Sequence, residues 1–466
     1  MAQAVAMVMV SAAASILIGG WTAKNEKFEN PQNTGGGDPA ANAPRVEPNS
    51  YRNVAVRQSL PPRQFVYGSC RIGGAVFYQD NDNPHLYIGC ALSDGPIDSI
   101  IDVYYGAERI IMATHSGNAA VAVDGTIYTD NFSLSYKLGT SDQEADTLIA
   151  DAPAVPADFW RRGVACAVVK MHWGADAATH SVLWGQSVSP SFFGRFKTVY
   201  DPRDVAQDID DPTTWVYSDN PALCVANALT TAWGVALDPD YIDWDSVGDA
   251  ADVCDEVITY QENSVATFTL SGVFKSDTDM AGQIQRMLDT FRGVITFSDG
   301  LYKIVADAPR TSVWTVTDDD ILEVQEYVHS ASITQAFGSI KASFYDSGDA
   351  GRQSQTEPYD DAIAIAAGET RETAIDLPFC PTSHAAQILA YRKLKELRSG
   401  RRLTLRVSDA AIALDAFEVI TVASASAPMF DGEYQVDLID MAETGYILQL
   451  REYVPTMYGD PEGYLV

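Results

Sequence analysis

The sequence predicts a mainly β protein with α+β parts, built from several small β-barrel or sandwich domains and one domain in which helices pack on a sheet. Three observations predict it. Short alternating runs separated by Gly, Asn-Asp and Ser-Asp-Gly turns begin at Gln64, as in small antiparallel barrels. Two amphipathic helices are indicated between Trp215 and Glu256. Alternating runs return after Thr311. A chain of 466 residues is long enough for three or four domains of about 100–150 residues each.

Residues 1–23 are expected to be a separate hydrophobic segment. Ala4 to Gly20 contain no charge, and as a helix they would span about 25 Å, at the short end of a membrane span. Three interpretations stand. The missing basic start disfavours a cleaved signal, the length allows a membrane anchor, and the small residues Ser11 to Ser15 favour a buried or self-associating helix. Residues 24–62 are rich in Asn, Gly and Pro and predict a flexible arm that reaches a neighbouring subunit.

Residues 63–115 and 159–212 together predict one β-barrel domain. Its strand candidates are FVYGSCRIGGAVFY, LYIGCALS and IDSIIDVYYGAERI in the first part, and RRGVACAVVKMHW and SFFGRFKTVY in the second. Residues 116–158 have weaker alternation and more small polar residues. We therefore expect them to form a small β domain inserted into the barrel.

The most informative stretch is WVYSDNPALCVANALTTAWGVALDPDYIDWDSVGDAADVCDE. Asp219 and Asn220 are good helix caps, and Pro221 suits a first helical position because its missing N–H is not needed there. Apolar residues then recur every three or four positions as far as Trp233, and Gly234 is expected to end the helix. The second helix carries its apolar face on Trp244, Val247, Ala251 and Cys254.

Residues 213–310 as a whole predict an α+β domain with helices on one face of a small sheet. A strand is expected over Ser264 to Phe274, and Ser276 or Asp277 is expected to cap a helix that Gly293 ends. The next two runs flank Ser-Asp-Gly at 298–300, which is a β-hairpin signal. The apolar face of this helix consists of Met280, Ile284, Met287, Leu288 and Phe291.

Residues 311–455 predict one or more further β-rich domains, followed by a C-terminal tail over 456–466. One helix is expected, with Ser383 as its cap and Gly400 as its stop. The last two strands are expected to form a hairpin around Glu-Thr-Gly at 443–445. The strand candidates are Ser332 to Phe344, Arg402 to Val407, Ala416 to Val422, Glu433 to Asp440 and Tyr446 to Tyr453.

The charge balance argues against a nucleic-acid-binding role. The chain has 31 basic and 63 acidic residues, a formal net charge of −32, and such a surface repels the phosphate backbone. An acidic wall past which DNA slides without sticking is compatible with this charge. No CxxC pair or zinc-type spacing occurs among the six cysteines, which we expect to be small buried side chains. They are Cys70, Cys90, Cys166, Cys224, Cys254 and Cys380.

The sequence predicts no catalytic, cofactor-binding or metal-binding residues. It contains no HExxH, Gly-x-Ser-x-Gly or Walker pattern, so we expect a protein that is not an enzyme. His172 and His180 are a weak candidate pair for metal ligation. The runs DNDN at 80–83 and DIDD at 208–211 carry the oxygen ligands that calcium prefers, but neither completes a helix–loop–helix pattern. Both runs are expected to be solvated turns.

Several stretches resemble one family. A tryptophan and a tyrosine followed by SDNPALC, a short helix and a second helix ending in Cys-Asp resemble the central tail hub proteins of long-tailed siphophages, which are related to the tip attachment protein of phage lambda. The runs VYG and RIGG near Gly68, GPID at 95–98, VYDPR at 199–203 and a helix followed by RLTLRV are similar to the same family. The resemblance covers most of residues 60 to 455. The Pro-Asn pair that usually precedes VYDPR is replaced by SVSP at 187–190.

The resemblance implies a structural virion protein at the tail tip or baseplate hub, assembled in the cytoplasm of the host bacterium. It implies a homotrimer around the tail axis, with distal tail or tail tube proteins, the tape-measure protein and tail fibre or tip proteins as partners. The hub would close the lumen, open it for ejection, and let DNA pass without specific binding. Residues 4–20 would face the lumen or contact a host membrane.

Two other functions stay open on the residues alone. One is a secreted or surface β-rich carbohydrate-binding or hydrolytic protein that uses the N-terminal segment as a signal. The missing basic start and the lack of a paired-cysteine framework count against it. The other is the spike-bearing hub of a contractile injection system, which shares the barrel architecture. Larger hub relatives continue into fibronectin-like modules and a receptor-reading tip, so we do not expect this chain to recognise the host.

Overall fold

A computed structural model of the chain describes residues 55, 61–82, 84–106, 108–112, 120–121, 128–150, 152, 155, 159–174, 176–184, 189–232, 234–329, 337–349, 351–366, 368, 370–459 and 465. Within these ranges the chain is mainly β with a few helices, which confirms the predicted fold class. The expected hydrophobic segment 1–23, nearly all of the expected arm 24–62, and Trp233 lie outside the described residues. Among the helices that are described, none has the length and apolar character needed to cross a membrane.

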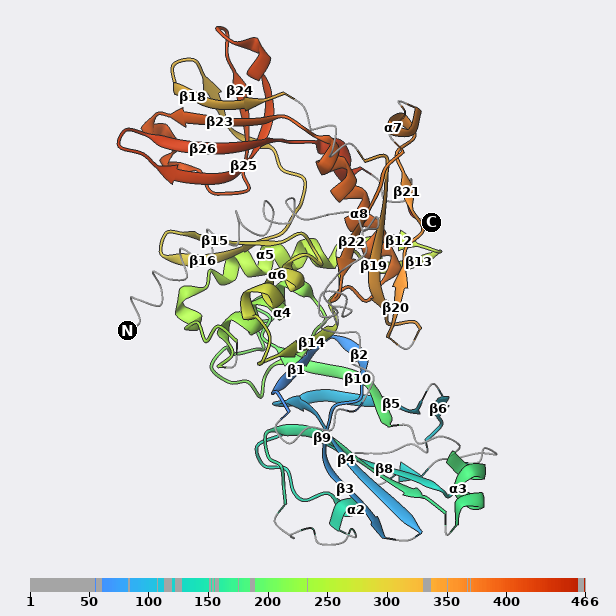
Figure 1. The fold of residues 1–466 in the computed structure, drawn as a ribbon. Helices are drawn as coiled ribbons and strands as arrows, with labels where there is room; N and C mark the ends of the chain where they lie inside the picture. The colour runs from blue at the N-terminus through green and yellow to red at the C-terminus, as the bar shows by residue number, and fades with distance from the viewer. Residues whose placement is uncertain are drawn as a thin grey trace, which may run out of the picture.

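The first unit, drawn blue to green in Figure 1, consists of two sheets that share one hydrophobic core. The five-stranded sheet has the order β3-β4-β9-β8-β7, and the second sheet has the order β11-β10-β5-β6 with β2 also paired to β10. Ile88 and Val169 reach the core from the first sheet, and Val103 and Phe192 from the second. The strands are β2 (Ser69–Ile72), β3 (Ala75–Asp82), β4 (His85–Asp94), β5 (Ile97–Tyr105), β6 (Glu108–Ile110), β7 (Ala120–Val121), β8 (Phe132–Leu138), β9 (Val164–His172), β10 (Pro190–Val199) and β11 (Val216–Tyr217).

The outer face of the five-stranded sheet is covered by the segment that follows β8. Helix α2 (Thr147–Ala150) packs Leu148 and Ile149 against Tyr87 and Val168 of the sheet. Beyond β9, helix α3 (Ala177–Trp184) follows and places Trp184 in the core. Strand β8 pairs along its whole length with β9. The described strands of 116–158 therefore belong to the sheet of the unit that they interrupt, instead of forming a separate sheet as expected.

The second unit packs three helices and a hairpin around the largest core. Its helices are α4 (Pro221–Thr230), α5 (Trp244–Asp255) and α6 (Met280–Leu288), with the short η3 (Pro239–Tyr241) between the first two. Strands β15 (Val294–Ser298) and β16 (Leu301–Val305) form the hairpin predicted from Ser-Asp-Gly at 298–300. The predicted helix faces are confirmed where they are described, because Val225, Val247, Ile284 and Met287 all lie in this core.

Three helix boundaries in this unit differ from the prediction, and one of them is the end of α6, which lies at Leu288 and not at Gly293. Helix α4 ends at Thr230 and not at Gly234, because Thr231 already adopts an extended conformation with ψ 141°. Helix α6 begins later than expected. Its cap is Asp279, whose side chain accepts a hydrogen bond from the Gly282 N–H, and not Ser276 or Asp277.

The strand predicted over 264–274 is wrong, because it is two strands in different sheets. Strand β13 (Asn263–Ala266) pairs with β12 (Val257–Tyr260), whereas β14 (Gly272–Lys275) pairs with β1 (Gln64–Tyr67) of the first unit. The chain between them bonds to three other segments, with Phe268 N–H donating to Cys254 O, Leu270 N–H to Asp219 O and Ser271 N–H to Phe379 O. The helices consequently pack on separate two-stranded ribbons and not on one small sheet.

The helical core continues past residue 310. A four-stranded sheet centred on β19 (Ser339–Asp346) carries β20 (Arg352–Gln355) and β21 (Tyr359–Asp360) on one side and the parallel β22 (Glu372–Leu377) on the other. The short α7 (Ala362–Ala366) follows β21, and α8 (Ser383–Arg398) packs on the sheet (Figure 1). Ile340, Phe344, Ile388 and Leu394 belong to the same core as α4, α5 and α6. The boundary expected at 310 does not coincide with an edge of this core.

The last unit is a six-stranded sheet that curls into a half-barrel, drawn yellow and red at the top of Figure 1. Its order is β17-β24-β25-β26-β23-β18, so the consecutive strands β17 and β18 lie at opposite edges. Its own core contains Leu405, Val422, Tyr434 and Leu448. The strands are β17 (Ser312–Thr317), β18 (Ile321–Val328), β23 (Arg402–Val407), β24 (Val419–Ala423), β25 (Gly432–Met441) and β26 (Tyr446–Glu452), with short helices η5 (Asp409–Ala413), η6 (Pro428–Phe430) and η7 (Pro455–Tyr458).

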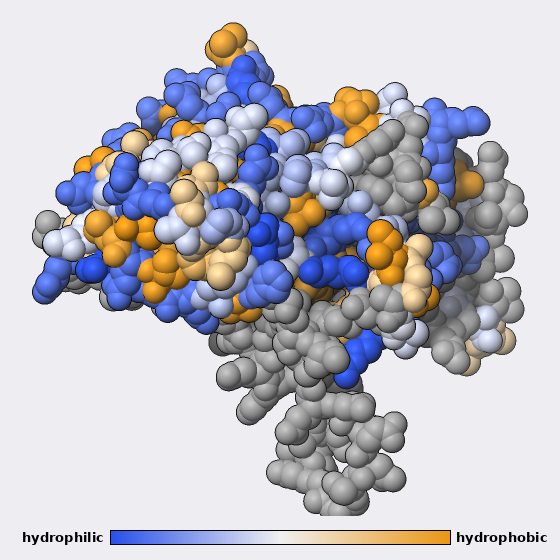
Figure 2. Space-filling view, turned by 90° about the horizontal axis from the view of Figure 1, so that it is seen from above, coloured by the Kyte–Doolittle hydropathy of each residue, from blue (hydrophilic) through white to orange (hydrophobic). Residues whose placement is uncertain are grey.

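The predicted strands of this region are confirmed with shifts of a few residues, and β23 matches its predicted bounds. The expected strand at 332–344 begins at Ser339 within the described residues. The cap residue of helix α8 is Thr382 and not Ser383. Seen from the half-barrel end, apolar surface residues lie in small groups separated by polar ones (Figure 2).

Candidate functional site

The first junction of the protein holds the barrel unit against the helices. Strand β1 pairs with β14 in antiparallel register, with Tyr67 opposite Gly272. Tyr67 is fully buried, and its hydroxyl donates to Asn227 Oδ1 of α4 over 2.9 Å. Its neighbour Gly68 has φ +66°, and a Cβ there would lie 1.9 Å from Leu270 O. Only glycine, which has no Cβ, lets the two segments approach this closely, so this contact requires glycine at position 68.

Asn220 ties the two predicted helices together. Its Oδ1 accepts the Ala222 N–H at 3.0 Å and so caps α4, while its amide nitrogen donates to Ala251 O of α5 over 2.9 Å. The side chain is 2% exposed, so both bonds form away from water. The predicted cap is therefore confirmed, and the same side chain links α4 to α5.

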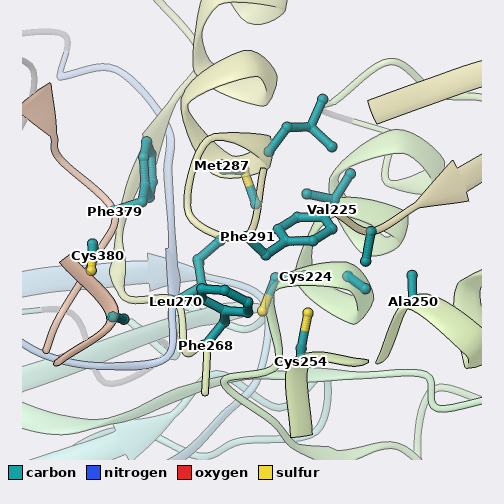
Figure 3. Packing of buried hydrophobic residues seen from close by; sticks show 14 of the residues in the cluster. Cys224, Val225, Ala250, Cys254, Phe268, Leu270, Met287, Phe291, Phe379 and Cys380 are labelled. Atoms are coloured by element: carbon teal, nitrogen blue, oxygen red, sulfur yellow. The ribbon is translucent and has the colours of Figure 1, made fainter. Parts of the chain in front are cut away.

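Figure 3 shows the packing beneath this hairpin, where Cys224 and Cys254 lie among Phe268, Leu270 and Phe291. Burial raises the pKa of both thiols, which keeps them protonated and unreactive. All six cysteines of the chain are buried, as the sequence predicts.

A second junction joins α8 to the half-barrel through buried charges. Glu396 of α8 accepts Arg451 Nη1 of β26 at 2.6 Å and Arg292 Nη1 at 2.9 Å. Arg292 Nε donates in turn to Asp307 Oδ2 at 2.6 Å, and Tyr458 OH donates to the other oxygen of Asp307 at 2.6 Å. Three parts of the chain that are distant in the sequence, namely residues 292–307, helix α8 and residues 451–458, thus meet at one charged cluster.

The cations in this cluster keep Glu396 ionised. Burial opposes its ionisation, but the charges of Lys393, Arg451 and Arg292 outweigh burial and lower the pKa of Glu396 to about 2. Burial also lowers the pKa of Lys393 to about 8. The helical core and the half-barrel core are separate clusters of residues. The contact between these two units therefore relies strongly on ion pairs, which depend on geometry more than apolar contacts do.

The loop that follows the barrel unit in the sequence has an acidic surface. Arg203, the last residue of the VYDPR run, pairs with Asp201 at 2.8 Å, Asp252 at 2.8 Å and Asp255 at 3.0 Å, and these hydrogen bonds raise its pKa. The loop after it ends in the DIDD run, where Asp208 Oδ1 accepts the Asp210 N–H over 3.0 Å. These carboxylates make turns within the loop. Most of the loop is exposed and negatively charged.

His172 and His180, the candidate pair for metal ligation, have different ring partners. His172 faces His85 across β9 and β4 with ring centroids 5.6 Å apart, and His180 packs on Trp173 at 4.2 Å. His384 contacts Ala266 O through Nε2 at 2.9 Å. In the described ranges, no group of three or more His, Cys, Asp or Glu side chains is placed to hold a metal ion.

Sequence reasoning missed the Glu396 cluster. Lys393 and Glu396 stand three apart on a predicted helix, which indicates a local ion pair. Arg292 and Arg451 come from segments whose approach depends on the fold, so no local pattern points to them.

Comparison with protein families finds one match. Residues 282–437 match the family described as "Putative phage tail protein". This stretch runs from α6 into β25 and includes most of the second junction. No curated protein matches the sequence.

Three solved structures that are similar to this chain come from virion or tail proteins. A chain titled "Virion of native gene transfer agent (GTA) particle" is similar with a TM-score of 0.60 and 15% identity, over 97% of this chain and 98% of that chain. A tail protein from Neisseria meningitidis MC58 gives a TM-score of 0.32 and 12% identity, over 86% and 98% of the two chains. A prophage MuSo2 43 kDa tail protein from Shewanella oneidensis gives 0.31 and 10%, over 86% and 96%. The family match supports a phage tail protein, and the first structure shows that this fold occurs in a virion particle.

Proposed function

We propose that the chain is a tail-tip or baseplate hub, a structural virion protein that joins the tail tube to the distal tip. The observation that carries the proposal is the family match over residues 282–437, which runs from α6 into β25 and contains α8 and the half-barrel strands β17, β18, β23 and β24. The fold shared with a chain of a virion particle over 97% of the sequence supports it. The resemblance of the helical hairpin to siphophage hubs agrees with both.

The hub would act as a homotrimer that closes the lumen before infection and opens it for DNA. A charge of −32 per chain supports the passage of DNA without adhesion, because like charges repel. The acidic loop after Arg203 and the exposed face of α5 would contribute to this repulsion wherever they face the lumen. The partly ionic contact between the helical unit and the half-barrel favours relative motion of the two, as in other polar interdomain contacts.

The mass of the purified protein in solution tests the trimer. Light scattering should give three times 50.5 kDa, and negative-stain images should show a three-fold ring with a central opening. A monomer that binds or cleaves a polysaccharide would overturn the proposal. Antibody labelling of virions should mark the distal end of the tail, and label along the tail tube or on the head would place the protein elsewhere.

The N-terminal segment has its own test. We propose that residues 4–20 contact the lumen, the tape-measure protein or a host membrane. The full chain should float with liposomes, and a variant lacking residues 1–20 should not. Equal flotation of the two would exclude a membrane role for this segment.

A further inference from the structure

A cavity of about 270 Å³ lies where three parts of the chain meet. Ser69 reaches it from the barrel unit, Asp219 and Thr269 from the helical unit, and Thr382 from the start of α8. The cavity is therefore built by segments that are distant in the sequence. It adjoins the first junction at Ser69 and Leu270, and none of its lining residues belongs to the Glu396 cluster.

Two hydroxyl groups of the cavity have no strong internal partner. Thr269 Oγ1 is shielded from solvent and forms no hydrogen bond. Thr382 stands at the cap position of α8, yet its side chain does not cap the helix, and the polar side chain beside it is the Cys380 thiol, which bonds only weakly. Buried polar groups are nearly always well hydrogen-bonded, so these two hydroxyls beside one cavity indicate a group that is absent from the isolated chain.

The remaining polar groups of the cavity are mostly acceptors. His384 is buried, which lowers its pKa and favours the neutral ring. A carbonyl can only accept, so Nε2 of His384 donates to Ala266 O over 2.9 Å and Nδ1 is left as an acceptor. Asp219 brings a carboxyl group, and no lysine or arginine lines the cavity. Among the described residues Asp219 has no ion-pair partner, and its nearest polar side-chain contact is Tyr217 OH at 3.4 Å.

The charge of the ligand that this cavity would bind follows from the charges around the cavity. The amino-terminal end of α8 contributes about half a positive charge, whereas an ionised Asp219 contributes a full negative one. The sum is negative, so a cation is favoured over an anion. Hydroxyl oxygens, Nδ1 and a carboxylate together suit a group with several N–H donors.

We propose that this cavity binds the cationic side chain of an arginine or lysine from a neighbouring protein. The neighbour rests on the proposed function, which places the chain in an assembly. A basic protein of a different kind fits better than a second copy, because this chain has only 31 basic residues against 63 acidic ones and so offers few cationic side chains that are not already matched by carboxylates. An arginine would match the site best, since its planar fork carries five N–H donors.

The chemistry can be tested on the purified chain by isothermal titration, with agmatine as the guanidinium probe and inorganic phosphate as the opposite charge. Agmatine should bind saturably at one site, and Asp219→Asn should weaken it at least tenfold. Asp249→Asn removes the same charge from an exposed position of α5 and should leave binding unchanged. Binding of phosphate in place of agmatine, or no binding at all, would overturn the proposal.

A second experiment distinguishes a cation carried by a protein from a free small cation. A blocked Gly-Arg-Gly peptide should bind like agmatine, whereas a blocked Gly-Glu-Gly peptide should not. If agmatine binds and the arginine peptide is excluded, the site takes a free small cation and the protein partner is wrong. Thr269→Val and Thr382→Val serve if Asp219→Asn does not fold, and each should weaken binding. All of these measurements use the isolated chain, so their failure leaves the mass and virion tests of the proposed function untouched.

Discussion

Arg451 Nη1 and Glu396 Oε1 lie 2.6 Å apart, and this ion pair joins the last strand of the half-barrel to helix α8. Removing one partner of such a buried pair leaves the other charge without compensation, which typically costs about 3–5 kcal/mol. We therefore expect Glu396→Gln to lower the free energy of unfolding by about 3 kcal/mol, measured by urea unfolding. Glu433→Gln is the matched control, because Glu433 is exposed on the same half-barrel, and it should change stability by less than about 0.5 kcal/mol. Equal effects of the two would contradict the role of the pair.

The same cluster predicts acid sensitivity. The pKa of Glu396 is about 2, below its ordinary 4.5, so the unfolded chain binds the proton more readily. The stabilisation by Glu396 is complete above about pH 5 and is lost as the pH falls towards 2. Urea midpoints measured between pH 7 and pH 3 should fall more steeply for the native chain than for Glu396→Gln. Parallel curves would show that other groups control the acid transition.

The side chain of Asn220 should contribute to the free energy of unfolding in two separable ways. Asn220→Ala removes both the cap of α4 and the bond to Ala251 O, and should cost about 2 kcal/mol. Asn220→Ser keeps a capping oxygen and loses only the bond to α5, so it should cost about half as much. Asp279→Ala, which removes only the cap of α6, gives the reference value for a cap. If the alanine and serine variants unfold at the same urea concentration, the bond to α5 contributes nothing beyond the cap.

The helical hairpin could be predicted from the sequence because its signals are local. Asn220, Pro221 and the three-to-four spacing of apolar residues act within a few positions of one another. The wrong prediction of the end of α4 also has a local cause. Thr231 adopts an extended conformation and ends the helix before Gly234 is reached. The half-barrel strands β23 to β26 were predicted for the same reason, through their alternation, whereas β17 and β18 were not predicted.

The pairing of strands that are distant in the sequence could not be predicted in this way. The run over 264–274 reads as one strand, but the segment between β13 and β14 bonds to Cys254, Asp219 and Phe379. These partners are brought there by tertiary packing, which overrides local propensity. The Asp219 cavity has the same origin, because its walls come from three separate segments.

Gly68 should be irreplaceable for a steric reason. Gly68→Ala forces a side chain into φ +66° and places its Cβ 1.9 Å from Leu270 O, so the first junction must shift. We expect a loss of at least about 2 kcal/mol. Gly300→Ala has φ +84° but nothing within 4 Å of the added Cβ, so it isolates the backbone term and should cost about 1 kcal/mol. Similar urea midpoints for the two variants would show that the junction relaxes freely.

His384 should make the fold less stable as the pH falls below its ordinary pKa of 6.5. Burial lowers its pKa in the folded chain, so below pH 6.5 the unfolded chain binds more protons and is favoured. His384→Gln keeps a donor for Ala266 O without titrating, so its melting temperature should drop less between pH 7.5 and pH 5.5 than that of the native chain. His329→Gln, at an exposed position, should retain the full drop. Part of the drop should persist in His384→Gln, because burial lowers the pKa of His85 as well. A native chain whose melting temperature is constant over this range would refute the sign of the effect.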